Sequence, residues 1–243
     1  MRSSHRGAIR PAGMVSVGVA MLQGGRHEHI EALIGAGKEM NVDVDVLFLR
    51  TSEDVTTEID ALVIPGGEST AMKIASRHYS LLDALYTLIR DRPHIPVLGT
   101  CAGAILLAHP HPSFTPFITA ELNRNSWGRQ RESFEALLDV HIATPSGAED
   151  IEVETTQQRG HIPLIMKRYA APSNEHGYPG VFIRAPRFAG YSGSCKPTVF
   201  LQDEVVGVVQ NNIMALTFHP ELTQDRRFHR WLIERVVQRG DDC

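Results

Sequence analysis

The chain has 243 residues and a formal net charge of −4, and 42% of its residues are apolar. This length and composition are typical of one sizeable globular domain with a hydrophobic core. The charge balance excludes the basic field on which nucleic-acid binding relies, and every apolar run is far shorter than the roughly 20 residues that span a bilayer. We therefore expect neither a nucleic-acid partner nor a membrane association.

The first 13 residues contain three arginines, no acidic residue and no apolar segment of the kind that targeting peptides carry. We interpret residues 1–13 as a flexible tail and residues 14–243 as a single domain. The three cysteines, Cys101, Cys195 and Cys243, are widely spaced and form no disulfide framework or metal motif. This cysteine usage favours a reducing compartment, the cytoplasm, and we expect no metal and no cofactor.

In the first half of the chain, short apolar runs typical of strands alternate with segments of helical periodicity. In chain order, these strands and helices are predicted at residues 15–21, 28–37, 42–48, 61–64, 69–76, 80–90, 97–99 and 102–108. The alternation predicts an α/β fold: a flavodoxin-like or Rossmann-like three-layer sandwich, with a mostly parallel sheet and helices on both faces. Ligands bind outside the carboxyl ends of such strands, where glycine turns are predicted at residues 23–25, 66–69 and 99–103.

The second half of the chain is richer in β-structure. Strands are predicted at residues 134–142 and 181–184, a hairpin at 198–201 and 205–209, and a last strand at 215–218. Residues 225–237 have the pattern of a closing amphipathic helix. Residues 143–178 have weak periodicity with several prolines and glycines, and we interpret them as an insertion, since structureless loops of that length are uncommon inside compact domains.

Cys101 stands at the centre of Gly-Thr-Cys-Ala-Gly, between a predicted strand and a predicted helix. This is the pattern of a nucleophile elbow, in which the flanking glycines let the chain turn sharply. The helix N-terminus favours the thiolate, and the backbone N–H of Ala102 is available to an oxyanion. A buried structural cysteine would also explain the motif alone, but its place between strand and helix favours a nucleophile. Cys195 and Cys243 have no such setting.

A cysteine nucleophile needs a base, and Phe-His-Pro-Glu follows the last predicted strand. Pro220 favours an extended conformation at His219, and residues two apart in an extended segment point the same way. Glu221 can then orient His219, so that the two residues complete a triad with Cys101, although the motif alone is more typical of a structural turn. The remaining histidines show no comparable arrangement. We interpret five of them as surface or loop residues: His27, His29, His78, His109 and His111.

Six strings in order make the sequence resemble class I, triad-type glutamine amidotransferases, and among them the glutaminase subunits of pyridoxal 5′-phosphate synthases. The strings are Leu-Gln-Gly (22–24), Pro-Gly-Gly-Glu-Ser-Thr (65–70), Arg-Asn-Ser-Trp-Gly-Arg-Gln (124–130), Ser-Phe-Glu (133–135), Phe-Ile-Arg-Ala-Pro (182–186) and His-Pro-Glu-Leu-Thr (219–223). Each string is weak alone, but their joint order is highly specific. The resemblance covers the chain from about residue 15 to residue 237, without the insertion.

The resemblance implies that L-glutamine is hydrolysed to L-glutamate and ammonia through a thioester on Cys101. Ammonia would then pass to a separate synthase subunit that assembles pyridoxal 5′-phosphate. The resemblance also implies an oxyanion region and a glutamine site. The oxyanion region comprises Gly67, Ala102 and Gln23, and the glutamine site comprises Gly67, Glu68, Ser69, Arg124, Ile183 and Arg184. The two arginines suit a carboxylate ligand, with which guanidinium groups form bidentate hydrogen bonds.

Two features depart from the family pattern. Gly25 stands where an alanine is usual, which predicts a looser backbone near the oxyanion region, and the segment 143–178 is longer than the usual link. Three other functions remain open. One is the glutaminase of another pathway, such as histidine or purine synthesis, against which the strings at 124–130 and 182–186 argue. The others are a non-catalytic regulatory module on the same fold and a cysteine peptidase with the same elbow.

Overall fold

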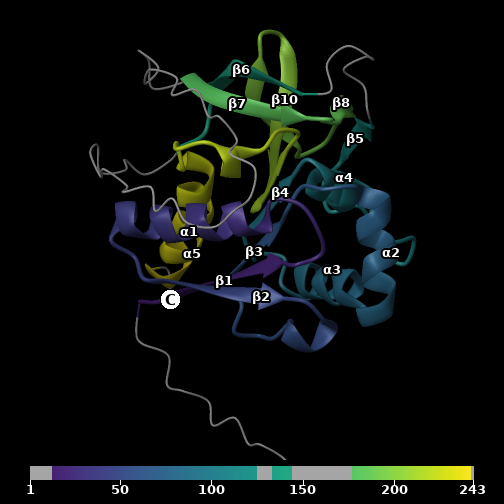
Figure 1. Ribbon diagram of the computed structural model, residues 1–243, viewed down its shortest axis with the longest axis vertical. Coiled ribbons are helices and arrows are strands. Elements are labelled where there is room, and N and C mark those ends of the chain that lie inside the picture. The colour runs from purple at the N-terminus through teal and green to yellow at the C-terminus, as the bar shows by residue number, and fades with distance from the viewer. Residues whose placement is uncertain (1–12, 125–132, 144–176, 242–243) are drawn as a thin grey trace, which may run out of the picture.

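The computed structural model describes residues 13–124, 133–143 and 177–241 (Figure 1). The predicted tail at residues 1–13 lies outside the described residues except for its last position. So do residues 144–176, which make up nearly all of the predicted insertion, and residues 125–130 of the string Arg-Asn-Ser-Trp-Gly-Arg-Gln (124–130).

One large sheet forms the centre of the described structure, with nine strands in the order β2-β1-β3-β4-β11-β10-β9-β6-β7 (Figure 1). Its first five strands are parallel: β2 (Val44–Leu49), β1 (Val15–Ala20), β3 (Ala61–Ile64), β4 (Val97–Thr100) and β11 (Ile213–Leu216). Its remaining strands are antiparallel to their neighbours: β10 (Glu204–Gln210), β9 (Lys196–Leu201), β6 (Ser133–Val140) and β7 (Gly177–Ile183). A separate pair is formed by β5 (Ala120–Asn123) and β8 (Arg187–Tyr191).

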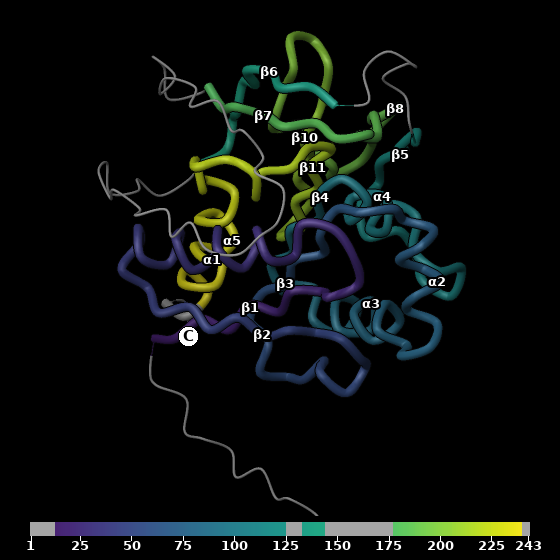
Figure 2. Tube along the Cα trace, in the orientation of Figure 1, coloured from purple at the N-terminus to yellow at the C-terminus, as the bar shows by residue number. Residues whose placement is uncertain are grey.

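Helices cover both faces of the parallel part of the sheet. One face carries α1 (Arg26–Met40) and α5 (Arg227–Asp241), which lie side by side in Figures 1 and 2 and pack in one hydrophobic cluster. The other face carries α2 (Ser69–Tyr79), α3 (Leu81–Asp91) and α4 (Ala102–Ala108). Two short 3₁₀ turns, η1 (Ser52–Asp54) and η2 (Pro220–Leu222), complete the described elements. None of the helices in these parts of the chain is long and apolar enough to cross a membrane.

The burial of β3 shows why its sequence is an unbroken apolar run. Leu62 and Ile64 pack in the cluster beneath α2, α3 and α4, whereas Ala61 and Val63 pack in the cluster beneath α1 and α5. Successive side chains of a strand point to opposite faces, so a strand covered on both sides needs an apolar residue at every position. All four residues are completely buried.

The α/β fold class predicted from the sequence is confirmed, with the parallel strands and their helices in the predicted order. The predicted hairpin is formed by β9 and β10, and the closing helix is α5. The strands β5 and β8 were not predicted, because they pair with each other across a long stretch of sequence, outside the large sheet.

The connectivity places four strand ends next to one another. β1, β3, β4 and β11 are consecutive in the sheet and parallel, so their carboxyl ends lie along one edge. The segments that leave these ends contain Gln23, Gly67, Cys101 and His219. The fold therefore brings residues that are distant in sequence to the edge at which α/β proteins bind their ligands.

Gly103 allows α4 to pack closely against the end of β3, and this contact offers a test of the packing. A Cβ atom at Gly103 would lie 1.9 Å from the carbonyl oxygen of Ile64, which is a backbone atom held by the sheet. We expect Gly103→Ala to lower the free energy of unfolding by about 1–3 kcal/mol or more, measured by urea denaturation. Gly190→Ala is the matched control, because a Cβ atom there meets nothing within 4 Å. Equal stability of the two variants would contradict this packing.

Candidate active site

Cys101 lies between β4 and α4 in a strained backbone conformation. Its φ and ψ angles are 49° and −106°, and its N–H donates a hydrogen bond of 2.8 Å to the carbonyl of Leu216 in β11. A positive φ at a residue other than glycine costs on the order of 1–3 kcal/mol and persists only where its surroundings enforce it. The predicted elbow is therefore present, with the cysteine itself at the strained position.

The two glycines of the elbow have a different role from the one expected. Neither Gly99 nor Gly103 has a positive φ, so they do not supply the turn. A Cβ atom at Gly99 would lie 2.5 Å from Cδ1 of Leu107, and one at Gly103 would overlap the carbonyl of Ile64. The glycines are thus needed because α4 approaches the sheet closely, which places its N-terminus directly behind Cys101.

His219 and Glu221 form a buried pair next to Cys101. The His219 Nδ1 atom lies 2.7 Å from Oε1 of Glu221, and the backbone N–H of His219 donates to the carbonyl of Val181 in β7 at 2.8 Å. The pairing was predicted, but its expected geometry was wrong. Pro220 starts the 3₁₀ turn η2, so Glu221 returns to His219 through a tight turn and not along an extended segment.

Gly66 brings the nucleophile and the base into contact with the turn after β3. A Cβ atom at Gly66 would lie 2.5 Å from Cε1 of His219 and 3.3 Å from Cβ of Cys101. The Cys101 Sγ atom is also 4.0 Å from the carbonyl oxygen of Ile183 at the end of β7. Since only glycine fits at position 66, the backbone of this turn forms a wall against both reactive side chains.

The electrostatics favour a charged His219 and a charged Glu221. Burial lowers the pKa of His219, but the Glu221 carboxylate and a hydrogen bond with Cys101 have the larger, opposite effect. The pKa of His219 is therefore raised to about 10. Burial raises the pKa of Glu221, but the neighbouring imidazoles of His29 and His219 and the hydrogen bond from His219 lower it, to about 2. A protonated imidazole beside Cys101 stabilises the thiolate that a cysteine nucleophile requires.

The predicted oxyanion residues lie in two turns that pack backbone against backbone. The side-chain Oε1 of Gln23 accepts a hydrogen bond of 2.9 Å from the N–H of Glu68, and a Cβ atom at Gly24 would lie 2.1 Å from the carbonyl oxygen of Gly66. Gly67 has a φ of 141°, a conformation that favours glycine. The structure therefore joins Gln23 and Gly67, and both turns adjoin the elbow that carries Ala102.

Glu68 has a structural task that the sequence did not reveal. Its carboxylate caps α2 by accepting hydrogen bonds from the N–H groups of Thr70 and Ala71, at 2.9 and 2.6 Å. These two bonds lower the pKa of Glu68. Arg124 reaches the same helix end, where its Nη1 donates to Oγ1 of Thr70 at 2.9 Å. Ser69, the first residue of α2, is buried.

The remaining predicted glutamine-site residues lie at the carboxyl end of β7. Ile183 ends this strand and presents its carbonyl oxygen to Cys101, whereas Arg184 is exposed and has a φ of 46°. The positive φ turns the chain sharply after Ile183, at the point where β7 leaves the sheet. Of the predicted residues, Gln23, Gly67 and Ile183 are thus brought close to the triad, and Arg124 and Glu68 lie together at the start of α2.

The interpretation of His29 as a surface or loop residue is wrong. His29 lies in α1 and is completely buried, and its Nε2 is 3.3 Å from Oε2 of Glu221. A signal was present in the sequence, since His29 shares with Leu33 and Ala36 the helical spacing of the face that α1 buries. Gly25, which precedes α1, also meets Glu221: a Cβ atom there would lie 2.6 Å from Oε1. The missing side chain gives the carboxylate room at the helix N-terminus.

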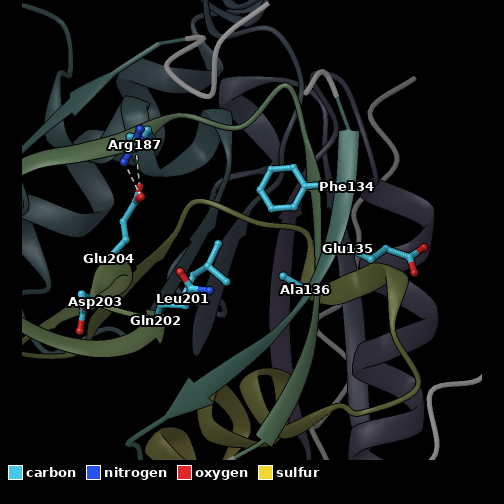
Figure 3. Close-up of a pocket in the computed structure, with 8 residues that line it drawn as sticks. All are labelled: Phe134, Glu135, Ala136, Arg187, Leu201, Gln202, Asp203 and Glu204. Atoms are coloured by element: carbon cyan, nitrogen blue, oxygen red, sulfur yellow. Dashed lines mark hydrogen bonds and ion pairs between the residues drawn. The ribbon is translucent and has the colours of Figure 1, made fainter. Parts of the chain in front are cut away.

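A cavity of about 740 Å³ lies in the antiparallel part of the sheet (Figure 3). Strands β6 and β9 pair at Asp139 and Val140, and the cavity lies where they separate, with Arg187 and Glu204 joined in an ion pair on one side. None of its lining residues is a predicted site residue. They are Phe134, Glu135, Ala136, Arg187, Leu201, Gln202, Asp203 and Glu204.

The described chain is a mixed α/β sheet with a buried Cys, His and Glu at the carboxyl edge of its parallel strands, and a solved structure described as a glutamine amidotransferase has a similar fold. The two have a TM-score of 0.65 and 32% sequence identity, with 91% of this chain and 98% of that one covered. The sequence profile of the SNO glutamine amidotransferase family matches residues 19–149 and 166–238, and the chain belongs to this family. The unmatched residues 150–165 fall within the predicted insertion.

The curated relatives cover nearly the whole chain. A protein of Pyrococcus furiosus named pyridoxal 5′-phosphate synthase subunit PdxT is 35% identical over 231 residues, which span 92% of this chain and 100% of that one. A protein of Thermococcus kodakarensis with the same name is 36% identical over 231 residues, which again span 92% of this chain and 100% of that one.

The buried pair makes a prediction about the titration of His219. Because the Glu221 carboxylate raises the His219 pKa, we expect the imidazole of the wild type to titrate near 10 and that of Glu221→Gln to titrate at clearly lower pH. Nuclear magnetic resonance of isotopically labelled histidine would measure both. Glu204→Gln, which alters the ion pair beside the cavity, should leave the titration of His219 unchanged.

The raised pKa of His219 also makes the free energy of unfolding depend on pH. The folded-state pKa of His219 lies above its ordinary value of 6.5, so the charged imidazole stabilises the fold fully below pH 6.5. This contribution is lost as the pH rises through about 10. Unfolding free energies that fall no faster in the wild type than in Glu221→Gln over that interval would contradict the pairing.

Proposed function

We propose that this protein hydrolyses L-glutamine to L-glutamate and ammonia, with Cys101, His219 and Glu221 as its catalytic triad. The observation that carries the proposal is the buried His219 imidazole, which lies 2.7 Å from Glu221 and next to Cys101, with the backbone of Gly66 against both side chains. Membership of the SNO glutamine amidotransferase family supports glutamine as the substrate. A non-catalytic module would have no need to keep a strained cysteine beside a buried ion pair.

The first half of the reaction forms a thioester. The Cys101 thiolate attacks the side-chain amide carbon of glutamine, and the carbonyl oxygen becomes an oxyanion. His219 then gives its proton to the departing nitrogen, the C–N bond breaks, and ammonia leaves. In the second half, His219 takes a proton from water, the resulting hydroxide attacks the thioester, and glutamate is released with the thiolate restored.

The backbone N–H groups of Ala102 and Gly67 are the proposed oxyanion donors. Ala102 opens α4, whose N-terminal N–H groups are free of helical partners. Gly67 has a positive φ, and the side chain of Gln23 stabilises its turn by accepting a hydrogen bond from the N–H of Glu68. A preorganised donor of this kind typically lowers the barrier by about 3 kcal/mol. We therefore assign Gln23 an organising role in the oxyanion region.

The proposed glutamine site extends from the triad toward the start of α2. Arg124 and Arg184 would bind the α-carboxylate, and the backbone at Gly67, Ser69 and Ile183 would contact the rest of the substrate. Glu68 contributes through its place in the turn, since its carboxylate already caps α2. The exposed position of both arginines beside a buried nucleophile supports an entry path for a polar amino acid.

We further propose that the ammonia is delivered to a separate synthase subunit that makes pyridoxal 5′-phosphate. The relatives that cover this chain almost completely are named as subunits of that synthase. Cys101 and Cys195 are both buried free thiols, which supports work in the reducing cytoplasm. The segment 143–178 is proposed to be an insertion in an otherwise single amidotransferase domain, which the unmatched residues 150–165 support.

Substitution of the nucleophile tests the function directly. Cys101→Ala should abolish glutamate release from glutamine, because no other group can form the thioester. Cys195→Ala is the matched control: Cys195 is also a buried free thiol and has no predicted role, so this variant should keep its activity. Glutamate release would be measured enzymatically with and without the synthase subunit, which should stimulate the wild type. Activity that survives in Cys101→Ala would disprove the assignment.

Substitution of Arg124 tests substrate binding separately from the chemical steps. If Arg124 binds the α-carboxylate equally in the ground and transition states, Arg124→Ala should raise KM by about 10- to 100-fold with little change in kcat. Arg187→Ala, which breaks the ion pair with Glu204 beside the cavity, is the control and should leave KM unchanged. A fall in kcat alone would show that Arg124 acts on the reaction and not on binding.

A further inference from the structure

Two buried histidines continue the line of the proposed triad into the core. The Oε2 atom of Glu221 lies 3.3 Å from Nε2 of His29 in α1, and Nδ1 of His29 lies 3.0 Å from Nε2 of His229 in α5. Both histidines are completely buried. His29 is therefore enclosed between the carboxylate that orients the base and a second imidazole.

His29 also reaches the strand that carries the nucleophile. Its Nε2 is 3.2 Å from Oγ1 of Thr100, which is buried and directly precedes Cys101. One imidazole nitrogen thus faces both Glu221 and the last residue of β4. Since α1 begins directly after the turn that contains Gln23, the same helix joins the oxyanion region to this contact.

The proton positions follow from the chemistry of the partners. Burial lowers the pKa of His29 more than Glu221 raises it, and burial also lowers the pKa of His229, so both imidazoles are neutral near pH 7 and His29 then acts on Glu221 through its N–H dipole and not through a full charge. A neutral imidazole has one N–H donor and one acceptor nitrogen, whereas a carboxylate only accepts. We therefore assign the hydrogen of His29 to Nε2, where it faces Oγ1 of Thr100 and Oε2 of Glu221, and Nδ1 then accepts from Nε2–H of His229. The remaining Nδ1 of His229 is an acceptor, and it has no partner among the described residues.

The other charged groups around the two histidines do not alter this arrangement. Glu28 and His219 act on His29 more weakly than burial and Glu221 do. Arg226 and Arg230 face His229 and lower its pKa, and both arginines pair with Glu39. Hence Glu221 is the carboxylate that His29 faces most closely among the described residues.

A contact at the second oxygen of Glu221 would limit rotation of its carboxylate group. His219 bonds to Oε1, whereas Oε2 makes no well-aligned hydrogen bond among the described residues. The imidazole nitrogen that faces Oε2 is Nε2 of His29, at 3.3 Å, which also bonds with Oγ1 of Thr100. A carboxylate held at one oxygen can rotate about its last side-chain bond, whereas one held at both cannot. The orientation of the base would then depend on a group that never touches the substrate.

We propose that His29 is a positioning residue: its Nε2–H, set by His229, lies between Thr100 and Oε2 of Glu221, restrains this carboxylate electrostatically and thereby fixes His219 against Cys101. The proposal rests on the triad proposed above and adds a fourth member to it. It differs from a purely structural role for a buried histidine, because it requires the N–H donor at Nε2 and not only the volume of the ring.

Two substitutions of His29 separate the donor from the volume. His29→Leu removes the donor, and His29→Gln places an amide N–H near the former Nε2. With the synthase subunit present at saturation, we expect His29→Leu to lower kcat for glutamate release by about 10- to 100-fold, with KM little changed. His29→Gln should recover most of the lost rate. Leu33→Val, in the next turn of the buried face of α1, controls for packing loss and should retain the wild-type kcat.

The pH profile gives a readout that a structural role would not move. Loss of the Nε2–H donor raises the pKa of Glu221, so the acid limb of kcat should move to higher pH in His29→Leu and stay in place in Leu33→Val. Thermal unfolding of each variant would show how much of any effect is due to stability.

Distinct results would overturn the positioning role and the proposed function. Wild-type kcat in His29→Leu, or equal losses in His29→Leu and His29→Gln, would overturn the role of His29. If His29→Leu does not fold, His29→Gln decides the matter: it must fold and retain the wild-type acid limb, and otherwise the proposal is wrong. Activity in Cys101→Ala, measured in parallel, would instead remove the triad on which the proposal rests.

Discussion

The buried carboxylate of Glu221 is the constraint on which the rest of the site depends. A charge without water is stable only where polar partners replace its hydration. His219 supplies a hydrogen bond at one oxygen, His29 faces the other, and the N-terminus of α1 comes so close that a Cβ atom at Gly25 would lie 2.6 Å from Oε1. The partial positive charge of that helix end adds to the effect. In turn, the charged Glu221 keeps His219 protonated beside Cys101.

Close backbone packing then brings the reactive groups to this carboxylate. Gly24 packs against the carbonyl of Gly66, Gly66 packs against His219 and Cys101, and Gly103 packs against the carbonyl of Ile64. At each of these positions a methyl group would overlap atoms that cannot easily move. The turns after β1, β3 and β4 are therefore fitted together without side chains between them. This fit leaves the strained backbone of Cys101 as a stable arrangement.

The roles of residues in a local sequence pattern could be predicted. The roles of residues that are compatible with two different environments could not. Cys101 could be singled out by its glycines, and His219 with Glu221 by the proline between them. Glu68 was expected at the substrate, but its carboxylate caps α2, because a carboxylate two residues before free helical N–H groups is drawn to them. His29 was overlooked although it shares the buried face of α1, since a histidine in an amphipathic helix is equally compatible with solvent.

The sequence by itself determined the order of the parallel strands and their helices, the elbow at Cys101 and the family strings, because these depend on spacing along the chain. Only the tertiary structure decided which atoms meet. It placed the carboxyl ends of β1, β3, β4 and β11 side by side and closed the 3₁₀ turn that returns Glu221 to His219. It also brought His29 and His229, 200 positions apart, into one buried line. Such contacts follow from strand order and helix packing, which no local pattern of residues contains.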